Sequence, residues 1–393
     1  MEIFKKKYKS WGRANNDSYL FGFPKTHIDL ESLIDNSDTF LASGKRRSYG
    51  DVCFNSRGVT IDMTNFDKVL SFDKEKGIIK VQAGITIDRL LRIIVPDGWF
   101  IQTSPGTKFV SIGGAIANDI HGKNHHNVGT FGNCVEGIKI INSKKEVLDL
   151  DPEDDLFKAT IGGLGLTGVI LEATIQLAKI ESSYLDVETL PFDNLDEFFK
   201  IEKDSVNKYE FTVSWIDLTN SNKSFCRGLF QRANWSKDRN FKVHSNKTLF
   251  LPYFLPFNMV SKRLMEIFNL IYFSIGKPKI PKSIKKTHYS SFFYPLDIIG
   301  GWNKLYGKKG FYQYQLALKE TSSSKGLREI LKVIKNSDVK PTLSVLKTFG
   351  PKKSKGLISF ATEGSTLTMD FPKNSEVKAL FAELNKIVLK NEG

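Results

Sequence analysis

Three glycine-rich segments within the first 180 residues constrain this chain more than any other feature of its sequence. They run from Ser43 to Asp51 (SGKRRSYGD), from Pro105 to His126 (PGTKFVSIGGAIANDIHGKNHH) and from Ile161 to Ile170 (IGGLGLTGVI). Short runs rich in β-branched residues lie between and beside them, and these predict strands: VTIDM, GIIKVQAG, EGIKIIN and GVILEATIQL. Thr86 to Val95 has helical spacing. Because no regular βαβ repeat is visible, the pattern predicts an α+β domain.

The glycines indicate a site for an anionic ligand. None of the segments matches the dinucleotide fingerprint G-x-G-x-x-G or the P-loop. Glycine has no Cβ, so its backbone N–H groups can approach an anion such as a pyrophosphate closely. One such loop alone is more often a simple turn. Three together, with His121, His125 and His126 beside the second, favour a binding site.

The sequence changes character after Leu177, where dense glycine clusters stop and aromatic residues become frequent. The runs YEFTVSWIDL, FYQYQLAL and TLTMDF alternate at period two, which predicts a largely antiparallel sheet. A last helix is predicted from Ser375 to Leu389. We therefore predict one domain at 1–180, a second at 181–374, and at 375–393 the start of a C-terminal return to the first domain that is cut short.

The net charge of +14 favours anionic partners, such as phosphorylated substrates or an acidic membrane. A solvated, lysine-rich surface is the alternative explanation of the same charge. The sequence has no zinc-finger spacing and no arginine-rich arm, so nucleic acid is not an expected partner. With 393 residues and ordinary globular composition, the chain is long enough for two domains.

The cysteines and the apolar segments indicate the cellular compartment of the protein. Cys53, Cys134 and Cys226 form no C-x-x-C pair, which fits a reducing compartment, and no apolar stretch follows the basic N-terminus as in a cleaved signal peptide. The most apolar segment, Leu249 to Ile275, is interrupted by prolines and charged residues, so we do not expect it to span a membrane. We therefore expect a cytoplasmic protein.

Several segments resemble one family of flavoproteins. GKRRSYGD, PGT, IGGAIANDIHGKNHH and GGLGLTG look like the FAD-binding segments of the vanillyl-alcohol-oxidase-type flavoproteins. SWGR, FFYPLDIIGGWNKLYGKKGFYQYQ, LKTFGP and DFP are similar to segments of the decaprenylphosphoryl-ribose 2-oxidase family, so the likeness covers nearly the whole chain. It implies an α+β fold, with a two-lobed FAD-binding domain of the vanillyl-alcohol-oxidase type and a substrate domain built on a largely antiparallel sheet.

The resemblance also implies a set of FAD-binding residues. The first loop would contact the pyrophosphate, the second would continue the phosphate cradle and lie along the flavin, and the third would reach the adenine end. The residues so placed are Arg47, Ser48, Tyr49, Gly50, Asp51, Gly106, Ser111, Ile112, Gly113, Gly114, Asn118, Asp119, Ile120, His121 and Ile170. In many covalent members a histidine of the first loop bonds the flavin. Arg47 stands at that position here, so we expect non-covalent FAD.

For chemistry, the resemblance assigns His121, Lys347 and Tyr49 as catalytic residues. It places Gln313, Gln315, Lys347, Phe349, Thr366 and Thr368 around the substrate, and Thr368 stands where mycobacterial enzymes carry a cysteine used by covalent inhibitors. Gln313 and Gln315 share one face of a strand, which is either a ligand-binding face or a solvated one. We expect no metal, because Gly122 and the loop context do not suit a helical His121–His125 pair, and we regard His126 as structural.

The implied reaction is FAD-dependent oxidation of a secondary hydroxyl of a polyprenyl-phosphate pentose. This would be the first half of an epimerisation to arabinose for an arabinan precursor of the cell wall, completed by an NADH-dependent ketoreductase. An aldonolactone or alditol oxidase of the same fold is an alternative. So is a non-catalytic flavin or lipid-sugar binding protein, because the lysine that the family carries on a strand after the last helix is absent from this sequence. We expect a fragment rather than a natural truncation.

A lipid-linked phosphosugar also implies a membrane contact. Leu249 to Ile275 is followed by the basic run KPKIPKSIKK, Lys277 to Lys286. An apolar stretch beside a basic cluster is typical of a peripheral contact, here at the inner membrane face. The alternative is an ordinary helical segment of the substrate domain followed by a solvated lysine loop.

Overall fold

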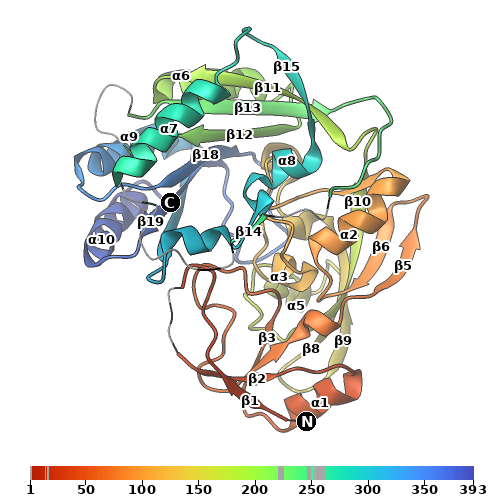
Figure 1. Ribbon diagram of the computed structural model, residues 1–393. Coiled ribbons are helices and arrows are strands. Elements are labelled where there is room, and N and C mark those ends of the chain that lie inside the picture. The colour runs from red at the N-terminus through yellow and green to blue at the C-terminus, as the bar shows by residue number, and fades with distance from the viewer. Residues whose placement is uncertain are drawn as a thin grey trace.

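The chain folds into two lobes (Figure 1). The computed structural model describes residues 2–13, 15, 17–219, 225–245, 249–251, 253, 260 and 262–393. The last strand of the first lobe is β10 (Val169–Lys179), and the first strand of the second is β11 (Tyr184–Phe192). The predicted boundary at residue 180 falls between them. Helices mixed with largely antiparallel sheets confirm the predicted α+β class.

The first lobe contains two sheets. The smaller has the order β1-β2-β4-β3 and consists of Phe4–Lys6, Tyr19–Gly22, Val59–Asp62 and Phe40–Ser43. The larger has the order β5-β6-β10-β8-β9, with β7 paired to β10; its strands are Val69–Asp73, Ile78–Gln82, Val169–Lys179, Val135–Ile141, Val147–Leu150 and Trp99–Ile101. The first glycine-rich segment follows β3, and the third leads into β10, so both lie at the ends of strands.

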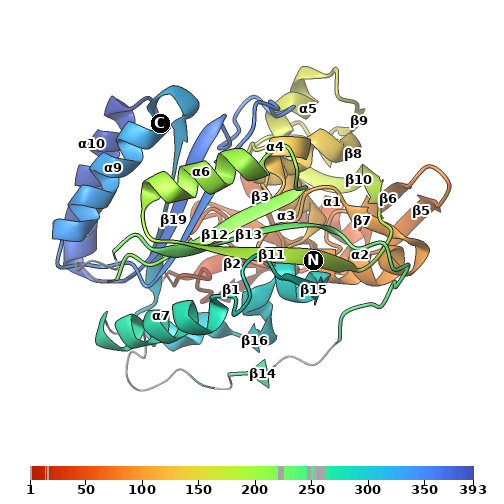
Figure 2. The same ribbon diagram turned by 90° about the horizontal axis from the view of Figure 1, so that it is seen from above.

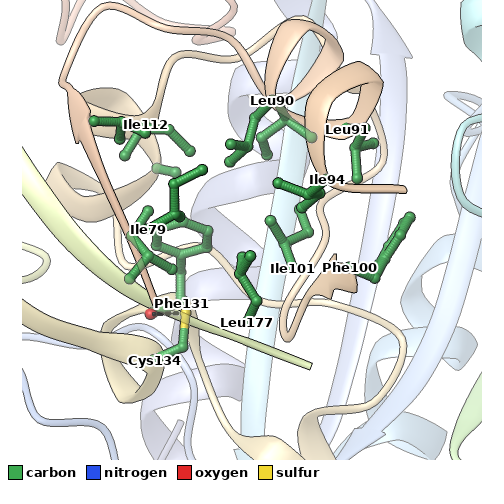
Figure 3. Packing of buried hydrophobic residues seen from close by; sticks show 14 of the residues in the cluster. Ile79, Leu90, Leu91, Ile94, Phe100, Ile101, Ile112, Phe131, Cys134 and Leu177 are labelled. Carbon is green, nitrogen blue, oxygen red and sulfur yellow. Dashed lines mark hydrogen bonds between the residues drawn. The ribbon is translucent and has the colours of Figure 1, made fainter. Parts of the chain in front are cut away.

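The helix predicted at Thr86 to Val95 is α2 (Ile87–Ile94). The Thr86 side chain accepts a hydrogen bond from the backbone N–H of Arg89 and so caps the helix. Figure 3 shows Leu90, Leu91 and Ile94 of this helix in one buried cluster with Ile101 and Leu177. The helical spacing of these residues brings them to one face, and their burial fixes α2 against the larger sheet. The other helices of this lobe are α1 (His27–Asp35), α3 (Ile112–Ala117), α4 (His125–Val128) and α5 (Asp155–Thr160).

The second lobe is built on a seven-stranded antiparallel sheet with the order β15-β11-β13-β12-β18-β19-β17. The runs YEFTVSWIDL, FYQYQLAL and TLTMDF form β12, β17 and β19, as predicted. Besides β11, the strands are β15 (Ile284–His288), β13 (Gly228–Trp235), β12 (Phe211–Ile216), β18 (Leu343–Phe349), β19 (Gly364–Pro372) and β17 (Phe311–Lys319). A short parallel pair, β14 (Leu249–Phe250) and β16 (Ile299–Gly300), lies outside this sheet.

Helices cover both faces of the seven-stranded sheet (Figure 2). One face packs against α6 (Leu195–Ser205), α9 (Glu320–Asn336) and α10 (Ser375–Lys390), and α7 (Lys262–Gly276) lies on the other. Strand side chains alternate between faces, so Leu316 and Leu346 enter the core under the helices. Their neighbours Gln315 and Lys347 point to the opposite face, toward the first lobe.

The last helix corrects one expectation. Residues 375–393 were expected to start a return to the first domain, but α10 packs against α9 and β17 of the second lobe. Val377, Leu380 and Leu384 are buried there because they share one helical face. No described helix is long and apolar enough to cross a membrane. Within the apolar segment Leu249 to Ile275, residues 252, 254–259 and 261 lie outside the described part of the chain.

Candidate active site

A cavity of about 710 Å³ lies between the lobes, where the three glycine-rich segments face β17, β18 and β19. Its volume is in the range of sites that hold small molecules and cofactors. The cavity brings together most of the residues expected from the sequence: Arg47, Ser48, Tyr49, Gly50, Gly106, Ser111, Gly113, Gly114, Asn118, Asp119, Ile120, His121, Ile170, Gln313, Gln315, Lys347 and Thr368. Segments distant in sequence therefore converge on one site.

Four expected residues do not line the cavity. Asp51 is exposed, and Ile112 is fully buried in the core of the first lobe. Phe349 is buried beside the rings of His121 and His125, at centroid distances of 4.8 and 4.6 Å. Thr366 is buried and contacts Gln315 through its hydroxyl, 3.2 Å from the amide nitrogen. Phe349 and Thr366 are therefore placed to support the residues that line the cavity.

In two loops of this cavity, the backbone is accessible to a ligand. Within the described residues, the backbone N–H groups of 45–50 make no hydrogen bond to the protein, so they remain available as donors. A Cβ built on Gly50 or on Gly106 would meet no protein atom within 4 Å. Packing of the protein does not require glycine at either position. Both instead leave room for a ligand that approaches the backbone, as a pyrophosphate would.

The start of α3 does not supply donors in the way the sequence suggested. The backbone N–H groups of Ile112 and Gly113 donate to the carbonyls of Ile85 and Ala83, at 2.8 and 2.7 Å, and that of Gly114 donates to Ser111 Oγ at 3.3 Å. The expected contribution of Gly113 and Gly114 to a phosphate cradle is therefore limited to shape. A Cβ on Gly113 would lie 3.0 Å from that of Ala83, so glycine allows the close approach of α3 to the sheet.

Arg47 is the residue that the sequence resemblance aligns with the flavin-linking histidine of covalent members. Its guanidinium stacks over the Trp11 ring, 4.3 Å from the centroid, and its Nε is buried without a hydrogen-bond partner among the described residues. Ser43 Oγ, also on the cavity wall, is buried and equally unpartnered. Burial lowers the pKa of Arg47, although an arginine stays protonated. Buried donors without partners are costly unless a ligand satisfies them, so both fit an anionic group.

A first polar chain runs from β17 to the second glycine-rich loop. The side-chain amide of Gln315 lies 3.0 Å from His121 Nε2, and Lys347 Nζ lies 3.1 Å from His121 Nδ1. Burial lowers the pKa of Lys347 to about 8, and burial with the nearby Lys347 holds the pKa of His121 well below its usual value. His121 is therefore neutral. The atom of Gln315 that faces His121 Nε2 is its amide nitrogen, which also donates to Thr366 Oγ1 at 3.2 Å.

A second polar chain runs from β17 to the first glycine-rich loop. Gln313 Nε2 donates to Asp370 Oδ1 at 2.9 Å, and the Gln313 amide also bonds the Tyr49 hydroxyl. Asp370 is buried, and its Oδ2 has no partner among the described residues. Burial raises the pKa of Asp370 to about 7 and that of Tyr49 well above its usual value. The cavity thus contains a carboxyl group poised near neutral pH beside a protonated phenol.

Sequence reasoning missed Asp370 as a site residue, although DFP was noted as a motif. The signal was present, because the period-two alternation that places Thr366 and Thr368 on one face of β19 also reaches Asp370. Outside the residues that line the cavity, Lys123 Nζ donates to the backbone carbonyl of Phe292. Burial and the nearby Lys347 lower the pKa of Lys123 to about 7. No pattern in the second loop distinguishes Lys123 from an ordinary surface lysine.

Asp119 lines the cavity but has a structural role. Its Oδ1 accepts the backbone N–H of Gly132 at 2.8 Å, and its Oδ2 accepts the hydroxyls of Ser354 and Ser359 at 2.6 and 2.7 Å. It thereby ties the second glycine-rich loop to the segment after β18. The adjacent histidines are also held by the protein: His125 Nδ1 accepts the Gly350 N–H, and His126 Nε2 contacts the Tyr209 carbonyl.

Known proteins that resemble this chain indicate its cofactor and its family. Residues 24–151 match the FAD-binding domain family. Decaprenylphosphoryl-beta-D-ribose oxidase of Mycolicibacterium smegmatis is 34% identical over 367 residues, covering 90% of this chain and 78% of that protein. L-galactono-1,4-lactone dehydrogenase of Brassica oleracea is 30% identical over 165 residues, 40% of this chain and 27% of its own length. D-lactate dehydrogenase of Anaerostipes hadrus is 26% identical over 147 residues, 36% and 31% of the two chains.

The two-lobed fold, the open glycine loops and the unpartnered buried donors fit FAD, and together with these matches they define an FAD-dependent oxidoreductase. The predicted cofactor is thus confirmed. Within this class, the sequence identity to the Mycolicibacterium smegmatis oxidase, which extends over most of both chains, determines the family. The chain belongs to the decaprenylphosphoryl-ribose oxidase family, as the sequence motifs indicated.

Proposed function

We propose that this protein oxidises a secondary hydroxyl of a polyprenyl-phosphate pentose. FAD, when bound, supplies the hydride acceptor for such an oxidation. One observation carries the proposal. The two networks of hydrogen-bonded side chains that start at Gln313 and Gln315 of β17 both reach the cavity beside the glycine-rich loops. The substrate class is supported by the 34% identity to a relative named for oxidation of decaprenylphosphoryl-ribose. The lactone dehydrogenase is a more distant match, which disfavours the aldonolactone alternative.

Asp370 is the proposed acceptor of the hydroxyl proton. Both carboxylate oxygens of Asp119 accept hydrogen bonds, from Gly132, Ser354 and Ser359, and Asp297 accepts from the Lys108 backbone and the Thr107 side chain. Asp370 accepts one, from Gln313 at Oδ1. Asp370 has a free Oδ2 and a pKa of about 7, so a large fraction is ionised at neutral pH. A base with a pKa near the working pH combines availability with proton affinity. Tyr49 stays protonated beside it and can donate a hydrogen bond to the sugar.

His121 and Lys347 are proposed to orient the substrate and to stabilise negative charge. The neutral ring of His121 links Lys347 to Gln315 across the two lobes, which fixes the position of all three side chains. Lys347 is half-buried, and because burial lowers its pKa to about 8 it carries positive charge below that pH. A fixed cation in a cavity stabilises charge that develops on a substrate oxygen, and it can also pair with the substrate phosphate. Gln313, Gln315 and Thr368 would contact the sugar.

The place of this reaction in metabolism follows from its product. Oxidation of one carbinol gives a keto sugar, so an NADH-dependent ketoreductase is the proposed partner that completes an epimerisation to the arabinose precursor of cell wall arabinan. A lipid-linked substrate also requires access from a membrane. We therefore propose a peripheral position at the inner membrane face, argued below from the surface of the second lobe.

The function is tested by mixing the flavin-loaded protein anaerobically with decaprenylphosphoryl-ribose, and separately with an aldonolactone and an alditol. We expect the flavin absorbance to bleach with the lipid-linked pentose alone, and a keto sugar to appear by mass spectrometry. Bleaching by the lactone would instead assign the protein to the soluble sugar oxidases. Bound flavin that none of the three reduces would favour a binding protein without catalysis.

The flavin is expected to be held without a covalent bond, because Arg47 cannot form the bond made by a histidine. Acid precipitation of the purified protein should release all of the flavin absorbance into the supernatant. An Arg47→His variant is the matched comparison, and any flavin retained in its pellet would show that this position is the attachment point. Flavin retained by the unaltered protein would contradict the prediction.

A further inference from the structure

Helix α7 carries an apolar stripe on its outer side. Leu264, Ile267, Phe268, Ile271 and Ile275 recur at helical spacing, and all five are exposed, Ile275 to 79%. Soluble proteins rarely present such a contiguous row of large apolar side chains to water, because each adds an unfavourable hydration cost. The stripe therefore points to a partner that removes it from water.

The inner side of α7 fixes this orientation. The buried amide of Asn269 donates to Asp217 Oδ1 at 3.0 Å, and the Tyr272 ring lies against Trp215 at 4.9 Å between centroids. Phe273 lies below the guanidinium of Arg227 at 4.6 Å. These contacts anchor the helix to β12 and β13, so rotation about its axis to bury the stripe would break a buried hydrogen bond and two ring contacts.

Positive charge adjoins the stripe. Lys277, Lys279, Lys282 and Lys285 are exposed, and within the described residues none of the four forms an ion pair. Lys286 is paired with Asp238 at 2.9 Å, and Glu266 is the acidic residue of the helix itself. The cluster is therefore strongly cationic in sum, and cations beside an apolar stripe complement anionic headgroups above acyl chains.

The apolar surface continues to the cavity. Phe250 of β14 is 71% exposed and also lines the cavity, together with Leu296 and Ile299 near β16. Figure 2 shows α7, β14 and β16 along the same side of the molecule, away from α6 and α9. A ligand held in an apolar layer at this side would thus meet an apolar edge of the cavity.

We propose that this surface, the α7 face, docks on an anionic lipid bilayer. It comprises the outer stripe of α7, the four lysines after it, and the apolar edge formed by Phe250, Leu296 and Ile299. The contact is a surface one, since the stripe covers one side of a helix whose other side packs on the sheet. The inference deepens the proposed function, on which it rests only for the use of the cavity edge as the entry of a lipid-linked substrate.

Vesicle co-sedimentation in the absence of substrate tests the proposal with the purified flavin-loaded protein. We expect binding to vesicles of phosphatidylglycerol mixed with phosphatidylcholine, and much weaker binding to phosphatidylcholine alone. A variant with Ile267→Ser, Phe268→Ser and Ile271→Ser should bind at least about 30-fold more weakly. A variant with Lys277→Gln, Lys279→Gln and Lys282→Gln should lose about 100-fold.

Matched controls come from outside the α7 face. Ile28, Val147 and Leu389 are exposed apolar residues elsewhere, and their serine variants should bind as the unaltered protein does. Lys200, Lys203 and Lys208 lie on or next to α6, across the sheet from α7, and their glutamine variants should also bind normally. Equal binding by all variants would overturn the proposal. So would a dimer in sedimentation equilibrium that the α7 serine variant abolishes, because a second copy would then cover the face.

The vesicle measurement separates this inference from the proposed function. Bleaching of flavin by a short-chain, water-soluble phosphoryl-pentose needs the cavity but no membrane, so both triple variants of the α7 face should retain it. Vesicle binding without any substrate oxidation would leave the docking intact and refute the proposed function. Oxidation of the soluble analogue without vesicle binding would refute the docking alone.

Discussion

An Asp370→Asn variant is expected to lose ~10²–10⁴-fold in kcat/KM for the lipid-linked pentose while it keeps its flavin. Asparagine has nearly the same shape and can still meet the Gln313 amide, but it cannot accept a proton. Asp370 lines the cavity, its buried Oδ2 has no hydrogen-bond partner among the described residues, and Gln313 holds its other oxygen at 2.9 Å. The loss should therefore fall on catalysis rather than on assembly of the site. Anaerobic flavin bleaching at limiting substrate measures it.

The pH dependence provides the signature of this role. Burial raises the pKa of Asp370 to about 7, so its carboxylate fraction grows as the pH rises through that value. The kcat/KM of the unaltered protein should rise across the same interval, and that of Asp370→Asn should not. Asp149 serves as the control, since its side chain is 75% exposed and its asparagine variant should follow the unaltered profile. An unchanged rising limb in Asp370→Asn would exclude Asp370 as the base.

The stability of the apoprotein offers a second readout. The pKa of Asp370 is higher in the folded state than the value of about 3.9 for an unfolded chain, so between these values the folded state binds more protons. Its contribution to the free energy of unfolding is therefore present at low pH and is lost as the pH rises through about 7. Asparagine stays neutral throughout. Above pH 7, thermal unfolding should show the Asp370→Asn apoprotein to be the more stable.

Much of the fold was predictable because it depends on local patterns. Period-two alternation located β12, β17 and β19, and a threonine before a helical apolar pattern located α2. The partner of the last helix was not predictable in this way. Amphipathic spacing shows that Val377, Leu380 and Leu384 must be buried, but it does not say against which sheet. Only the tertiary structure places them on α9 and β17.

The sequence predicted which residues lie at the site better than it predicted what each of them does. Most of the residues that the family resemblance assigned to the site do line the cavity. Whether a backbone N–H is free depends on a distant carbonyl, however. The N–H groups of Gly113 and Gly114 are already used by Ala83 and Ser111, while those of 45–50 are not. In the same way, Asp119 is a structural residue because Gly132, Ser354 and Ser359 donate hydrogen bonds to it. No local sequence pattern predicts these contacts.

A Gly106→Val substitution is expected to remove FAD binding while it leaves the apoprotein folded. Gly106 has no neighbour within 4 Å of a built Cβ, and its backbone does not adopt the left-handed conformation that favours glycine. A Cβ at this position meets no protein atom, and Gly106 lines the cavity, so we expect a valine side chain to occupy cavity space rather than to disturb the fold. Overpacking costs about 1–3 kcal/mol, so the Kd for FAD should rise by at least about 10-fold. Titration of the apoprotein with FAD, followed by flavin fluorescence, measures this change.

Gly113→Val is the matched control, because the same side chain there meets the sheet instead of the cavity. Its Cβ would lie 3.0 Å from the Ala83 Cβ and 3.2 Å from the Ala83 carbonyl oxygen, so α3 would be pushed from its place. We expect this variant to lower the unfolding temperature of the apoprotein, whereas Gly106→Val should leave it almost unchanged. Normal FAD affinity in Gly106→Val would show that the pyrophosphate does not pass this loop. A destabilised Gly106→Val apoprotein would show that the glycine serves the fold rather than the cofactor.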